Sequence, residues 1–174
     1  MHKLDSSKDL DALIEDIRDV PVVMLGEASH GTHEFYTWRI AISKRLIRKK
    51  GFSFIGVEGD WPDCYKINRF EKGYKEAGDN VRDVLMNFDR LPTWMWANWE
   101  VAALAEWLRE YNQRLLIDKM VGFYGMDVYS LWDYMREMMN YLQKEDPPIA
   151  QSVKKAISCL SLMGGMNIYT PVTP

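Results

Sequence analysis

The sequence predicts an α/β fold built on a partial, mostly parallel sheet that is flanked by helices. Three short apolar runs, at residues 22–25, 52–57 and 121–124, are typical of buried strands. Segments of helical periodicity separate them, and a long helical stretch lies between the second and third strands. Such crossovers allow neighbouring strands to run parallel. Because sheets usually hold five or six strands, we expect these three to be part of a larger sheet.

The first part of the chain is predicted to form a helix, a strand and a second helix. Apolar residues at helical spacing predict an amphipathic opening helix: Leu10, Leu13, Ile14 and Ile17. Gly26 ends the first strand. The next helix is expected over residues 37–50, where apolar side chains again recur at helical spacing.

Helices dominate the remainder of the chain. Residues 61–71 are predicted to be helical, with Pro62 in the first turn, where the missing N–H of proline breaks no hydrogen bond. Pro92 interrupts the chain, and a longer helix is expected to begin near Asn98. Further helices are predicted at residues 81–88, 131–143 and 150–160, with Pro147 and Pro148 between the last two.

The composition argues against several classes of partner. The 174 residues carry a net charge of -3 and are 47% apolar, which is enough for a core. The longest basic run is Arg48–Lys50, so we expect neither a nucleic-acid partner nor a membrane partner. A cytoplasmic location is expected, since the first residues lack an apolar core of signal-peptide length. Cys64 and Cys159 have no metal-binding spacing and are expected to be reduced thiols.

Polar side chains follow the predicted strands, at the edge of the sheet where open α/β folds bind ligands. Each strand is followed by an acid, in turn Glu27, Glu58 and Asp127. A neutral imidazole held by a carboxylate is the usual general base, so His30 beside Glu27 is the candidate catalytic pair. The alternative is that His30 caps a helix or completes a loop. Arg39 is expected to hold an anionic group or to pair with one of the acids.

Metal binding is an alternative chemistry for this cluster, because Glu27, His30 and Glu58 are all possible ligands. The order HGTHE at residues 30–34, however, matches neither H-E-x-x-H nor H-x-x-E-H. Because of this mismatch, we expect no metal. A phosphate-binding glycine motif is also missing, so we expect no bound nucleotide and no other cofactor. Ser29 does not lie in a G-x-S-x-G elbow, and helix capping is its expected role.

Four segments of the chain resemble the erythromycin esterase family. They are LGEASHGTHEFYTWR, GFSFIGVEGDWPDCYKINRF, LPTWMWANWEVAALAEWLREYN and VGFYGMDVYSLW, in family order between Val22 and Trp132. The resemblance implies an α/β hydrolase, unrelated to the serine-triad fold, in which a histidine activates water in a deep cleft without a required metal. It also implies a carboxylic ester or a macrolide lactone as the small-molecule substrate, and with it a role in antibiotic resistance.

The resemblance also assigns roles to individual residues. His30 matches the general base of the family, Glu27 the acid beside it and Arg39 the arginine of the same site. Glu58 matches the acid after the second strand. We predict substrate contacts for His33, Trp61, Trp94, Trp96 and Asp127, although the tryptophans also fit a role as core or cleft wall.

The length of the chain bears on these expectations. Family members are more than twice as long, so residues 1–159 are predicted to be the N-terminal part of such a domain, with at most half of a site. Residues 160–174 fit no element and are predicted to be a non-native or disordered tail. A one-nucleotide frameshift is one hypothesis for this tail, and an ordinary divergent or truncated end is the alternative. A non-catalytic fragment, with apolar surface left open for self-association, is the remaining functional alternative.

Overall fold

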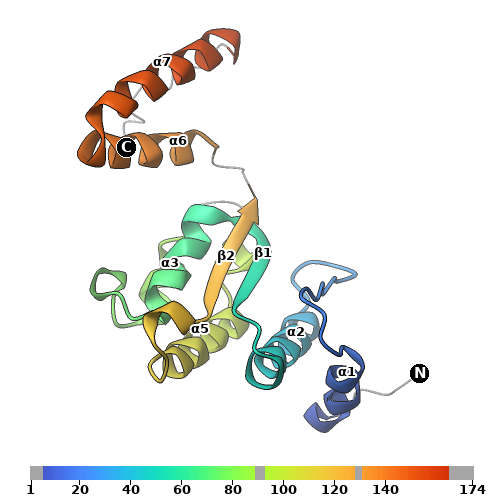
Figure 1. The fold of residues 1–174 in the computed structure, drawn as a ribbon. Coiled ribbons are helices and arrows are strands. Elements are labelled where there is room, and N and C mark those ends of the chain that lie inside the picture. The colour runs from blue at the N-terminus through green and yellow to red at the C-terminus, as the bar shows by residue number, and fades with distance from the viewer. Residues whose placement is uncertain (1–5, 89–92, 128–130, 165–174) are drawn as a thin grey trace. The chain divides into compact units, whose positions relative to one another are not determined.

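The structure, a computed structural model, describes residues 6–88, 93–127 and 131–164. The chain divides into two compact units, residues 1–127 and 128–174 (Figure 1). Within the described residues, the first unit contains the sheet and all the candidate site residues, and the second contains two helices.

The sheet of the first unit consists of two parallel strands, β1 (Phe54–Asp60) and β2 (Gly122–Asp127), within the described residues. Phe54 pairs with Gly122 at one end and Asp60 pairs with Asp127 at the other, with a shift in register between Val57 and Asp60. The two strands therefore end together, as expected for neighbouring parallel strands.

The crossover between the strands is helical, as the sequence predicts. It consists of α3 (Trp61–Glu71), α4 (Val81–Met86) and α5 (Trp99–Asn112). Pro62 lies in the first turn of α3, and the side chain of Asn98 caps α5 by accepting a hydrogen bond from the N–H of Val101. The described part of the crossover also contains three short 3₁₀ segments: η3 (Lys75–Ala77), η4 (Thr93–Met95) and η5 (Ile117–Lys119).

The predicted strand at residues 22–25 is wrong, because this segment has no regular secondary structure. Val22 and Met24 are 68% and 91% exposed, whereas Val23 and Leu25 pack against a small cluster formed by Leu10, Ile14, Ile42 and Leu46. An apolar run predicts burial, and here two of its four residues are partly buried without any strand pairing.

The helices around this segment follow the prediction with shifted ends. The opening segment forms η1 (Ser7–Asp9) and α1 (Leu10–Asp16). The next helix, α2 (His33–Arg45), begins four residues before the predicted start and continues as a π-helical turn, η2 (Leu46–Lys50). Gly51 ends it in the left-handed conformation, which glycine adopts without strain.

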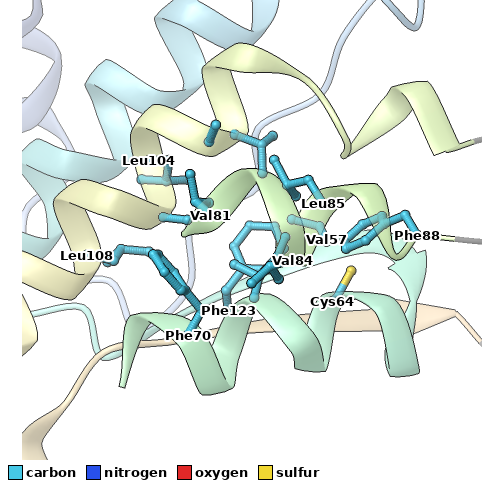
Figure 2. Packing of buried hydrophobic residues seen from close by; sticks show 14 of the residues in the cluster. Val57, Cys64, Phe70, Val81, Val84, Leu85, Phe88, Leu104, Leu108 and Phe123 are labelled. Carbon is cyan, nitrogen blue, oxygen red and sulfur yellow. The ribbon is translucent and has the colours of Figure 1, made fainter. Parts of the chain in front are cut away.

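The main core lies where the crossover helices pack on the sheet (Figure 2). Phe70 on α3, Leu108 on α5 and Phe123 on β2 are almost completely buried. Two buried asparagines satisfy backbone groups at the sheet. Asn112 accepts from the N–H of Val121 and donates to its carbonyl, and Asn68 donates to the carbonyl of Phe123. These bonds fix β2 against α3 and α5.

The second unit pairs α6 (Leu131–Glu145) with α7 (Pro147–Gly164). The predicted break at the two prolines is confirmed, but α7 begins at Pro147 because proline suits the first turn of a helix. Asp146 caps it by accepting from the N–H of Ile149. The helix continues to Gly164, so the first residues of the predicted tail are helical. Residues 165–174 lie outside the described residues, and the predicted tail boundary stays a prediction.

The length and hydropathy of the helices bear on membrane insertion. Among the helices of the described residues, none combines the length and the apolar character that crossing a membrane requires. The sequence expectation of no membrane partner remains a prediction.

Candidate active site

Glu27 lies at the centre of a three-residue arrangement between the loop and α2. Its Oε1 is 2.6 Å from Nδ1 of His30, and its Oε2 is 2.7 Å from Nη2 of Arg39. The Glu27 side chain is 9% exposed, whereas that of His30 is 49% exposed. The carboxylate is therefore enclosed by its two partners while the imidazole remains accessible from solvent.

This geometry arises from a turn and a helix start. Gly31 adopts a φ of 78°, a left-handed conformation that favours glycine and lets the loop fold back before α2 begins. Glu27 and His30 are three residues apart on this loop, and Arg39 follows within α2. Ser29 does not cap α2 as expected, because Thr32 is the N-cap residue and the two hydroxyls lie 2.9 Å apart.

Aromatic rings hold the Arg39 guanidinium in place. Its Cζ lies 4.8 Å from the ring centroid of Tyr36 and 5.5 Å from that of Trp96, both within the range of cation–π attraction. Tyr36 is 3% exposed, and burial, followed by the negative charge of Glu27, raises the pKa of its phenol. The Tyr36 hydroxyl therefore stays protonated beside the carboxylate.

His33 forms a second histidine–carboxylate pair. It occupies the first position of α2, and its Nδ1 contacts Oε1 of Glu100 at the start of α5. Oγ1 of Thr37 lies 3.4 Å from its Nε2. Both ring nitrogens thus have partners inside the protein, although the side chain is 70% exposed. Its predicted role in substrate contact stays a prediction.

The carboxyl ends of β1 and β2 bring acids together. Glu58 and Asp60 lie at the end of β1, and Asp127 pairs with Asp60 in the register. Partial burial, followed by the charges of Glu58 and Asp60, raises the pKa of Asp127. Asp127 therefore retains its proton to a higher pH than an isolated aspartate, because burial and neighbouring negative charges both disfavour its ionised form.

A cavity of about 820 Å³ connects the Glu27–His30–Arg39 arrangement with Glu58 at the end of β1. Residues 20–27 form one wall, and α2 and β1 form the others. Glu27, His30, Arg39 and Glu58 all line it, and most of the remaining lining is aliphatic or aromatic. The volume lies in the range of small-molecule sites. The four predicted catalytic residues therefore border one space.

The predicted substrate-contact residues are distributed differently. Trp96 lines this cavity, whereas Trp61, Trp94 and Asp127 do not. Trp61 stacks on Tyr65 at 4.6 Å between centroids, and Trp94 packs on Gly31. Their predicted roles in substrate contact stay predictions.

Sequence reasoning missed two residues of the site, Tyr36 and Glu100. Tyr36 is an aromatic residue in a helical pattern, which indicates a core position and carries no sign of the neighbouring Glu27. Glu100 is 67 residues from His33 in the chain. Only the packing of α5 beside α2 brings it there, and no local spacing could have revealed it.

The metal alternative depends on several ligands lying together. Across residues 6–88, 93–127 and 131–164, no group of three or more His, Cys, Asp or Glu side chains could hold a metal ion. Cys64 is a buried free thiol, and burial raises its pKa to about 12. In the described part of the chain, Glu27, His30 and Glu58 do not form the ligand set considered above.

Comparisons with known proteins agree with the fold. The chain is 28% identical over 127 residues to Erythromycin esterase type II of Escherichia coli, which covers 73% of this chain and 28% of that protein. A crystal structure of a Bacillus cereus protein superposes with a TM-score of 0.69 at 26% identity, covering 90% of this chain and 36% of the other. A structure titled succinoglycan biosynthesis protein gives 0.68 at 25% identity, covering 91% and 38%. The chain thus spans about a third of the length of these relatives.

The family match covers a defined part of the site. Residues 47–171 match the family described as Erythromycin esterase, so the match includes Glu58 and begins after the loop that carries Glu27 and His30. It extends over most of the predicted tail as well. With a match over well over half of its residues, the chain belongs to the erythromycin esterase family.

Proposed function

We propose that this chain carries the general-base part of an ester-hydrolysing site, in which His30 activates water for attack on a carboxylic ester or lactone. The observation that carries the proposal is the position of Glu27, which bridges His30 and Arg39 through its two oxygens. A carboxylate held in this way orients the imidazole and stabilises the charge that the imidazole gains.

The chemistry follows from the two nitrogens of His30. Nδ1–H donates to Glu27, which leaves the lone pair of Nε2 to take a proton from water. The resulting hydroxide adds to the carbonyl carbon and gives a tetrahedral oxyanion. When this intermediate collapses, the C–O bond to the alcohol breaks, and the imidazolium returns its proton to the departing alkoxide.

The other residues serve this step in distinct ways. Arg39 balances the charge of Glu27 and limits its movement, since its guanidinium itself packs against the rings of Tyr36 and Trp96. Glu58 lies on the same cavity, where its carboxylate is available to a substrate hydroxyl or to the attacking water. The largely apolar walls suit the apolar portion of an ester or a macrolide lactone.

The name of the Escherichia coli relative supports a macrolide ester bond as the substrate. A role in antibiotic resistance and a cytoplasmic location accompany this proposal. Because the chain spans about a third of its relatives, the activity is proposed for the site that these residues form.

A direct test measures hydrolysis by the 174-residue chain. Purified protein is incubated with p-nitrophenyl butyrate and, separately, with erythromycin, and products are quantified by absorbance and mass spectrometry. We expect His30→Ala to lose about 10²- to 10⁴-fold of the rate, the usual contribution of a general base. His33→Ala is expected to retain measurable activity.

Circular dichroism melts of each variant show whether the fold is kept. Equal rates for the wild type and His30→Ala would contradict the proposal. A complete lack of hydrolysis by the wild type would also contradict it for this chain and would favour the non-catalytic alternative.

A further inference from the structure

The segment from Trp94 to Glu100, which joins η4 to α5, contacts residues on several sides of the proposed site. Trp94 packs on Gly31, Trp96 contacts both Arg39 and the backbone of Glu58, and Glu100 contacts His33. We propose that Trp96 is a positioning residue, which holds the His30–Glu27–Arg39 arrangement and the end of β1 in a fixed relation. The inference rests on the proposed function, in which His30 is the base.

The indole N–H of Trp96 fixes the end of β1. Nε1 donates to the carbonyl of Glu58 at 2.7 Å. The approach requires glycine at position 59, because a Cβ there would lie 2.8 Å from the same Nε1. This hydrogen bond therefore restrains the position of the Glu58 backbone at the edge of the cavity, in addition to the strand pairing with β2.

The ring of Trp96 fixes Arg39. The guanidinium Cζ is 5.5 Å from the ring centroid, and Tyr36 and Phe123 each pack edge-on against the indole at 6.0 Å. Phe123 is buried in the core, so its contact restrains rotation of the indole away from Arg39. A restrained Arg39 in turn restrains Glu27, and Glu27 orients His30.

The backbone that carries Trp96 is itself fixed. The side chain of Asn98 donates to the carbonyls of Trp94 and Met95 and accepts from the N–H of Val101. The segment is thus tied to the first turn of α5, a helix whose inner face lies in the core. A residue that only lined a binding pocket would need none of these ties, so the geometry favours positioning over substrate contact.

The test uses the chemical reactivity of His30 and does not depend on turnover. Diethyl pyrocarbonate modifies accessible imidazoles, and peptide mass spectrometry follows His30 and His33 separately. At pH 8, above the ordinary titration range of an imidazole, the hydrogen bond from Nδ1 to Glu27 makes Nε2 the stronger nucleophile. Loss of the correct Glu27 position should therefore slow the modification of His30.

We expect Trp96→Leu and Arg39→Met to slow the modification of His30 several-fold, while His33 reacts at the wild-type rate. Trp96→Phe, which keeps an aromatic face for Arg39, should restore most of the His30 rate. Trp107→Leu is the matched control, because Trp107 is also partly buried and lies near two cations, Lys44 and Arg48, but does not line the cavity.

Two outcomes of the reactivity experiment would overturn the inference. One is wild-type reactivity of His30 in Trp96→Leu, and the other is an equal slowing in Trp107→Leu, which would indicate general loosening of the fold. Where hydrolysis is measured, Trp96→Leu should lower kcat with little change in KM, whereas a rise in KM alone would assign Trp96 to substrate binding and overturn the inference. If the wild type shows no hydrolysis, the proposed function fails, and the His30 reactivity still decides the role of Trp96.

Discussion

The two histidine–carboxylate pairs of this molecule use the same chemical groups in different ways. His30 and Glu27 lie three residues apart on one loop, and Glu27 has Arg39 on its other oxygen. His33 and Glu100 come from two helices, and the second nitrogen of His33 lies near Thr37. The first pair therefore leaves one nitrogen available beside a cavity, whereas the second has both nitrogens occupied and no place on that cavity.

The difference bears on the proposed role of His30 as the general base. A general base needs an accessible lone pair next to the substrate, in addition to an orienting acid. The His30 pair has both features, and the His33 pair has only the acid. The His33 pair joins the first turn of α2 to the first turn of α5.

The largest expected effect is a difference in hydrolysis rate between variants of Glu27 and Glu100. Glu27→Gln should reduce hydrolysis by about 10²-fold or more, because the amide neither orients His30 in the correct tautomer nor stabilises its charged form. Glu100→Gln should keep most of the activity. Steady-state rates on p-nitrophenyl butyrate give the comparison, and equal losses in the two variants would remove the distinction between the pairs.

Glu71 extends the comparison to a carboxyl group in the core. It is 1% exposed, and burial raises its pKa well above the usual value for glutamate. Its carboxyl is neutral in the folded state at pH values where the unfolded chain ionises. The contribution of Glu71 to the free energy of unfolding is therefore fully present below about pH 4.5, the usual pKa of glutamate. It falls by about 1.4 kcal/mol per pH unit as pH rises towards the pKa of Glu71 in the folded state.

Urea unfolding at several pH values measures this effect. In Glu71→Gln the decline attributable to this group should disappear, and the variant should gain stability relative to the wild type as pH rises. Glu106→Gln, on the exposed face of α5, serves as the control. An identical pH dependence in the wild type and Glu71→Gln would contradict the assignment.

The turn between the two histidines depends on Gly31. Gly31→Ala places a Cβ at a φ of 78° and 3.0 Å from the ring of Trp94, and the backbone strain alone costs about 1–2 kcal/mol. Gly73→Ala is the matched control, since Gly73 has a φ of 71° and open space around it. Thermal melts should show a larger decrease in melting temperature for Gly31→Ala than for Gly73→Ala. Equal decreases would mean that the Trp94 ring moves aside without destabilising the fold.

The smallest expected effect concerns the stability contributed by the second pair. The His33 side chain is largely exposed, so Glu100→Gln should cost less than about 1 kcal/mol, and the loss should shrink at high salt. Denaturant unfolding at low and high salt gives this number. A loss above about 2 kcal/mol would show that the pair contributes far more than surface pairs usually do.

The sequence predicts the parts of this molecule that local patterns determine. The starts of α3 and α5 follow from Pro62 and Asn98, which act within their own turn. The Glu27–His30 pair was predictable for the same reason, because both residues lie on one short loop. The parallel pairing of β1 and β2 follows from the helical crossover that separates them.

The misses are the features that depend on distant partners. Residues 22–25 have the composition of a strand, but strand formation needs a hydrogen-bonded neighbour, and the described structure provides none for them. The contact between His33 and Glu100 and the position of Trp96 over Arg39 depend on how α5 packs beside α2. The sequence indicated a core or cleft-wall position for the tryptophans, including Trp96, without showing which contacts they make.

The two glycines at the ends of β1 and β2 determine where this site tolerates redesign. A Cβ at Gly125 would lie 2.4 Å from the carbonyl oxygen of Gly59 and 2.7 Å from that of Asp60, and both neighbours are backbone atoms that cannot rotate away. Any side chain at position 125 would separate the strand ends that carry Glu58 and Asp127. A mutant library aimed at new substrates should therefore keep Gly59 and Gly125 fixed and vary the flexible methionines Met24 and Met126 on the cavity wall.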